Sequence, residues 1–183
     1  MIKIILSFLA GIALVALVAI LSAGDLMLKE YESPFGVEET AARVQANIQG
    51  LENRGWKLSA LRNPAKAVAA GGTNVLPVLL VEACSTKYSA PLLKEDETRI
   101  LSILMPCTIT IYKKDNGKTY IGTMNSGLMG KMFGAKVAAV MAEVAKDQAK
   151  FVVMDPSKPA PPLIRKRPGG GGGKGGAAAD AGC

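Results

Sequence analysis

Apolar and polar positions along the chain divide it into an opening apolar run, a patterned domain and a polar tail. Residues 4–23 contain no charged side chain. At about 1.5 Å of rise per residue, a helix of this length covers the ~30 Å hydrocarbon core of a bilayer. We therefore expect residues 1–24 to be a transmembrane anchor or, if cleaved near Gly24, a signal peptide.

Both interpretations export the rest of the chain. Lys3 precedes the apolar run and Asp25 follows it, which favours an N-terminus in the cytoplasm. The expected location is the inner, cytoplasmic membrane, with the domain in the periplasm or outside the cell. After cleavage near Gly24, the domain would instead be secreted to the periplasm. A membrane is therefore a predicted partner of the anchored form.

The first half of the domain is predicted to begin with a short extended segment at 31–35. Apolar residues then recur at steps of four and three, which predicts a helix that ends at Arg54-Gly55. A strand is expected over 56–61 and a loop over 63–74. The apolar helix positions are Val37, Ala41, Val44, Ile48 and Leu51.

The second half begins with a nearly continuous apolar run at 75–84, which has the length of a buried strand. A short helix is expected over 85–96. Another strand is expected over 100–113, interrupted at Met105-Pro106. A long helix closes the domain, with its apolar positions facing inward: Met129, Phe133, Val137, Val140, Val144 and Phe151.

Asn116-Gly117 separates two runs with strand character, 107–112 and 119–124. This predicts a β-hairpin, because Asn-Gly readily adopts positive φ. In the first arm, the side chains of Cys107, Ile109 and Ile111 alternate with those of Thr108, Thr110 and Tyr112, so one face is apolar and the other polar.

The predicted order β-α-β-β-α-β-β-α indicates an α+β fold with two layers, a mainly antiparallel sheet with helices on one face, plus the N-terminal transmembrane helix. The domain is expected to span residues 25–154. Residues 155–183 are first Pro-rich and then Gly-rich. We expect them to form an extended and then disordered tail, because such compositions do not build a core.

Composition narrows the chemistry. The chain has 183 residues and no histidine, which excludes imidazole bases, His-ligated metals and Ser-His or Cys-His nucleophiles. The net charge is +7, but residues 25–154 carry only 16 basic against 13 acidic side chains. With few and scattered aromatic residues, no nucleic-acid partner is predicted.

Several short motifs follow one another in a recognisable order. They are Ser33-Pro34 with Glu39-Thr40, Cys84 at a strand end, Met105-Pro106-Cys107 at a strand start, and the Asn116-Gly117 hairpin. Together they resemble the domain-of-unknown-function family 302 over residues 31–152. The resemblance implies a fold similar to one repeat of the TATA-binding-protein fold and no established catalytic activity. Some members carry a histidine after the second strand, where this chain has Asn63-Pro64.

The cysteines are the first candidate site. Cys84 ends one predicted strand and Cys107 begins the next. They can be buried thiols, a structural disulfide, or a reactive or ligand-binding pair. Cys183 ends a glycine-rich arm that reaches roughly 20 Å. Its thiol can carry a sulfur or acyl group, tether a second chain, or be an idle terminus.

Three further features complete the candidates. Glu82 lies in an apolar strand, where a carboxylate needs a partner or a raised pKa unless it faces solvent. Tyr112 and Tyr120 lie on the polar face of the predicted hairpin, which we expect to take a protein partner or form a homodimer. Three methionines near Cys107 have the soft ligands that copper(I) prefers, although core packing explains them equally. They are Met124, Met129 and Met132.

We therefore interpret the chain as a membrane-anchored extracytoplasmic binding or interaction module. The sequence assigns no catalytic residue, metal or cofactor, and these observations favour a binding protein over an enzyme. The alternative is a thiol redox or sulfur-carrier protein using Cys183 or the Cys84/Cys107 pair. The third hypothesis is copper(I) binding.

Overall fold

The computed structural model describes residues 2–21 and 23–165. The expectations for Cys183 and the glycine-rich tail lie outside these residues. In chain order the elements are α1 (Ile2–Leu21), α2 (Ala23–Met27), β1 (Leu28–Ser33), α3 (Val37–Gln49), η1 (Glu52–Arg54), β2 (Trp56–Arg62), α4 (Pro64–Ala70), β3 (Val78–Ser85), α5 (Thr86–Leu93), α6 (Asp96–Arg99), η2 (Ile100–Leu104), β4 (Cys107–Lys113), β5 (Thr119–Met124), α7 (Ser126–Lys131) and α8 (Ala135–Phe151).

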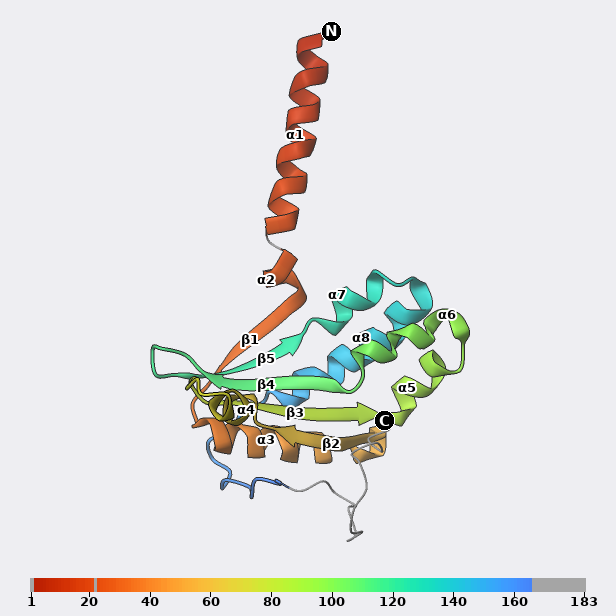
Figure 1. The fold of residues 1–183 in the computed structure, drawn as a ribbon. Helices are drawn as coiled ribbons and strands as arrows, with labels where there is room; N and C mark the ends of the chain where they lie inside the picture. Colours follow the sequence, from red (N-terminus) through yellow and green to blue (C-terminus); the bar gives the residue numbers. More distant parts are fainter. Residues whose placement is uncertain (1, 22, 166–183) are drawn as a thin grey trace.

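The strands form one five-stranded sheet with the order β1-β5-β4-β3-β2, and every neighbouring pair is antiparallel (Figure 1). The predicted α+β class with an antiparallel sheet is confirmed. The predicted hairpin is also confirmed, because Tyr112 of β4 pairs with Tyr120 of β5. Gly117 in its turn has a φ of +80°, a value that few residues other than glycine adopt without strain.

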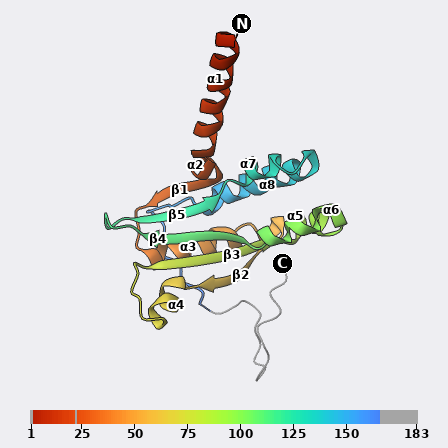
Figure 2. The same cartoon turned by 45° about the horizontal axis from the view of Figure 1, so that its top comes forward.

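The core lies between the sheet and the two long helices α3 and α8. Figure 2 shows α3 behind the sheet, where it contacts β2, β3 and β4. Four of the five inward positions predicted for this helix are confirmed, since Val37, Ala41, Val44 and Ile48 are buried, whereas Leu51 follows the end of α3 and is partly buried. From α8, Phe151 meets the Trp56 ring edge-on at 4.9 Å between centroids. These contacts fix the sheet's inner face.

Several local predictions differ from the structure. The helix predicted to end at Arg54-Gly55 ends at Gln49, and the separate 3₁₀ helix η1 follows it. Residues 64–70 form α4 instead of a loop, because the Asn63 side chain accepts a hydrogen bond from the Lys66 backbone N–H and caps the helix. Residues 100–104 form the 3₁₀ helix η2 rather than part of a strand. The predicted closing helix is divided into α7 and α8 at Gly134, whose φ is +89°, so that Phe133 lies in the turn.

The N-terminal helix α1 projects away from the sheet (Figure 1). Many of its apolar side chains are exposed, among them those of Phe8 and Val15. Within residues 2–21 and 23–165, no helix meets the combination of length and apolarity needed to cross a bilayer. The transmembrane part of the predicted fold is therefore not confirmed.

Residues 155–165 lie along α3. The Gln45 side chain accepts a hydrogen bond from the Ile164 N–H and donates one to the Ile164 carbonyl, both at 2.9 Å. The Arg43 guanidinium donates to the carbonyls of Asp155 and Lys158. The Pro-rich part of the predicted tail is thus held to the domain through its backbone.

Candidate functional site

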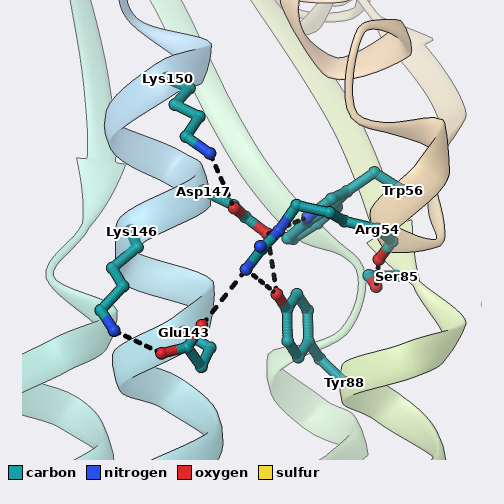
Figure 3. Close-up of polar contacts among 8 residues, drawn as sticks. All are labelled: Arg54, Trp56, Ser85, Tyr88, Glu143, Lys146, Asp147 and Lys150. Carbon is teal, nitrogen blue, oxygen red and sulfur yellow. Dashed lines mark hydrogen bonds and ion pairs between the residues drawn. The ribbon is translucent and has the colours of Figure 1, made fainter.

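A buried polar cluster joins four elements at one end of the core (Figure 3). Its centre is Asp147 of α8, which is fully buried. One carboxylate oxygen, Oδ2, accepts hydrogen bonds from Trp56 Nε1 at 2.9 Å, Arg54 Nε at 2.8 Å and the Tyr88 hydroxyl at 2.9 Å. Arg54 also donates to the Tyr88 hydroxyl at 2.6 Å. The cluster therefore ties η1, β2 and α5 to α8.

The electrostatics of this cluster keep its groups in fixed protonation states. Burial opposes ionisation of Asp147, but hydrogen bonds from Trp56, Arg54 and Tyr88 outweigh it and lower the carboxyl pKa. Hydrogen bonds to Asp147 and Tyr88 raise the pKa of Arg54. Burial, followed by the contact with Asp147, raises the pKa of Tyr88. None of these shifts moves a group toward neutral pH, which favours a structural role over acid-base catalysis.

An apolar cavity of about 50 Å³ adjoins the cluster. It is bounded by the end of the sheet, α5, η2 and α8. Trp56 and Tyr88 contribute to both the cluster and the cavity wall. The rest of the wall is mainly aliphatic or sulfur-containing: Leu92, Leu101, Leu104, Met105, Cys107, Val137, Val140, Met141 and Val144, with Cys84, Ser85, Ser89 and Phe133. Such a wall suits an apolar ligand.

The structure brings Cys84 and Cys107 to the same cavity but does not join them. Cys107 is a free thiol, so the predicted alternative of a Cys84–Cys107 disulfide is wrong. Their strands pair with Cys107 opposite Ala83 rather than Cys84. Desolvation raises the pKa of Cys107 to about 11, which leaves little thiolate at neutral pH and disfavours Cys107 as a nucleophile.

The predicted polar face of the hairpin is the outer face of the sheet. Tyr112 and Tyr120 lie directly opposite each other, with ring centroids 6.1 Å apart in a stacked arrangement. The Tyr112 hydroxyl donates to Glu30 at 2.5 Å, and Lys114 pairs with the same carboxylate. Desolvation and the Glu30 hydrogen bond raise the pKa of Tyr112 to about 12. The Tyr112 hydroxyl therefore stays protonated at neutral pH.

Glu82 lies on this outer face as well, opposite Thr108 in the register. Its side chain is largely buried and pairs with Arg62 of β2. Of the possibilities that the sequence leaves open, the structure shows a carboxylate with a partner. Glu82, Tyr112 and Tyr120 are thus parts of one surface, whereas Cys84 and Cys107 line the cavity.

The candidate copper ligands lie in different elements. Met124 ends β5, Met129 lies in α7, and Met132 follows α7 with its side chain 62% exposed. Cys107 lines the cavity instead. In the part of the chain that the structure describes, no three His, Cys, Asp or Glu side chains are grouped to hold a metal ion.

The polar cluster was not predicted from the sequence. One signal was available: along α8 the buried positions Val137, Val144 and Phe151 continue a stripe that includes Asp147. A carboxylate on a core-facing stripe requires a buried partner. That partner, Arg54, lies 93 residues earlier in the chain, so its identity was not accessible from local pattern.

Comparison with known proteins agrees with this fold. A family model described as "Domain of unknown function DUF302" matches residues 29–153. The crystal structure of an uncharacterized conserved protein DUF302 from Bacillus stearothermophilus is similar, with 20% sequence identity and a TM-score of 0.60. The match covers 69% of this chain and 95% of that chain. No curated protein matches the chain.

Proposed function

The chain belongs to the DUF302 family of unknown function, and from this premise we propose that it is a non-catalytic binding module. In this proposal, the outer face of its sheet packs against the same face of a second copy of the chain. The observation that supports this best is the composition of that face. Thr108 is exposed, and Tyr112 and Tyr120 are half-buried with their rings stacked on each other. Flat aromatic surface of this kind is enriched in protein interfaces.

The charges on the outer face favour an identical partner. Three carboxylates on this face are each paired within the chain, Glu30 with Lys114, Glu32 with Lys118 and Glu82 with Arg62. A face with strong net charge would repel a copy of itself. Because these acids are already neutralised, two such faces can meet around a twofold axis without leaving them unpaired.

The association is tested with the full chain in a mild detergent by sedimentation velocity. We expect a dimer, and we expect the double substitution Tyr112→Ala and Tyr120→Ala to raise its dissociation constant at least about tenfold, because the aromatic contact area is lost. Thr108→Glu is a second variant, which places an unpaired carboxylate on the same face without removing a core side chain.

Thr73→Glu is the matched control, since Thr73 is exposed in the loop between α4 and β3. It should leave the dimer intact. A dimer that survives both outer-face variants, or a chain that remains monomeric at all concentrations, would show that this face is not the interface.

We propose further that α1 holds the module at a lipid surface, with the domain outside the cytoplasm. The support is the exposed apolar surface of α1, on which Phe8 is 68% and Val15 is 70% exposed. Exposed apolar area of this extent is costly in water and is stabilised by contact with lipid.

Liposome flotation measures this attachment. The unmodified chain should float with the vesicles, and Phe8→Asp with Val15→Asp should leave most of it in the dense fraction. The control is Val68→Asp with Val75→Asp, since both valines are exposed in or after α4, outside α1. Equal flotation of the α1 variant and the unmodified chain would contradict membrane attachment through α1.

Thiol chemistry is the weaker alternative. The raised pKa of Cys107 argues against it as a fast-reacting group. A carrier role for Cys183 remains a separate hypothesis, because that residue lies outside the described residues.

A further inference from the structure

We propose that the apolar cavity beside Trp56 binds the end of a linear alkyl chain, such as that of a fatty acid. This ligand site is independent of the outer sheet face and does not rest on the proposed dimer. The apolar side chains of the cavity wall are the first observation that supports this ligand. Leu92, Leu101 and Val137 form a small second core cluster there, and Met105 and Met141 add flexible thioethers that adapt to an inserted chain.

Size sets the shape of the ligand. The cavity holds about 50 Å³, roughly one third of the ~150 Å³ of an apolar cavity that takes benzene. A bulky ring system therefore does not fit, whereas a narrow chain of a few methylene groups does. Each buried methylene contributes about 0.8 kcal/mol.

The rim of the cavity explains where the rest of such a ligand would lie. Phe133, in the turn between α7 and α8, lines the cavity and is 45% exposed, so it marks the mouth. Its chain neighbour Met132 is 62% exposed, and Ile103, beside the lining residue Leu104, is 82% exposed. Apolar side chains on both bordering segments extend the apolar surface outward, as a ligand longer than the cavity requires.

No group in the cavity demands a charged ligand. The polar partners of the Tyr88 hydroxyl and the Trp56 N–H lie in the Asp147 cluster. The Cys107 thiol is neutral, because desolvation raises its pKa to about 11. Insertion of an alkyl chain therefore leaves no charge unpaired, and any polar head of the ligand remains outside the mouth.

Trp56 is the single tryptophan of the chain and lines this cavity, which makes its fluorescence a local reporter. Helix α1 also presents apolar surface, but it contains no tryptophan. Titration of the full chain with decanoate, below its micelle concentration, should give a saturable change in Trp56 emission. Adamantane carboxylate, which has the same head group on a rigid cage, should give none.

Two substitutions locate the binding. Val140→Leu adds a methylene inside the cavity and should weaken decanoate binding. Ile103→Lys alters only an exposed rim side chain, so the fold is retained, and should weaken binding roughly tenfold. Val68→Lys, an exposed valine of α4, is the matched control and should leave the affinity within about twofold.

Three results would each overturn the proposal. They are the absence of a saturable Trp56 response to decanoate, equal affinity for adamantane carboxylate, and equal weakening by Val68→Lys and Ile103→Lys. The second would exclude a narrow site, and the third would place binding on apolar surface in general.

Discussion

At the scale of single residues, Asp147 is the centre of the buried polar cluster, where it accepts hydrogen bonds from three side chains. Asp147→Asn keeps the volume but removes the charge that pairs with Arg54. Because breaking a buried pair leaves its partner uncompensated, we expect a loss of about 3 kcal/mol in the free energy of unfolding. Urea unfolding followed by Trp56 fluorescence measures it.

The same residue predicts a pH dependence. Its pKa is lowered in the folded state, so the unfolded state binds more protons in acid. The contribution of Asp147 is complete above its ordinary pKa of about 3.9 and is lost as the pH falls from there through the folded-state value. Asp147→Asn should flatten the stability curve in that acid range. Glu143→Gln, at the exposed end of the cluster, should retain most of this pH dependence of the free energy of unfolding.

At the scale of elements, the packing of α7 on α8 depends on Gly130. A Cβ added at Gly130 would overlap the Met141 side chain and lie 3.2 Å from the Ala138 Cα. We expect Gly130→Ala to lower the free energy of unfolding by roughly 1–3 kcal/mol, because the helices must move apart. Thermal unfolding by circular dichroism measures the loss.

Gly127, one turn earlier in the same helix, is the matched control. Its added Cβ would lie 3.5 Å from the Ala145 Cβ, an ordinary contact. Gly127→Ala should be neutral or stabilising by up to about 1 kcal/mol, because alanine favours the helix. If both substitutions have the same effect, helix propensity rather than close approach determines the result.

At the scale of the whole molecule, residues 155–165 tie the far end of the chain to α3. Gln45 makes both of its amide hydrogen bonds to the Ile164 backbone. Gln45→Ala should therefore release this segment and increase chymotryptic cleavage after Leu163 several-fold, as measured by mass spectrometry. Gln49→Ala, at an exposed position of the same helix, should not. Equal cleavage of both variants would show that Gln45 does not hold the segment.

Local patterns predicted the parts of the molecule that depend on near neighbours. The stripe from Val37 to Ile48 predicted α3, since helical spacing alone places these side chains on one face. Asn116-Gly117 predicted the hairpin for the same local reason, and the alternation around Ile109 identified the sheet's inner face. The α4 helix was not predicted, because the Ala and Gly residues after Asn63 favour a loop, whereas the Asn63 side chain caps a helix in the structure.

The sequence by itself determined the α+β class, the antiparallel hairpin and the outer face of Tyr112 and Tyr120, because helix and strand periods are written into consecutive residues. Only the tertiary structure decided that Asp147 meets Arg54 across 93 residues, that Cys107 is a free thiol in an apolar cavity, and that Gln45 binds Ile164. Those contacts depend on how distant elements pack, and a local sequence pattern does not specify which buried groups from distant elements will contact each other.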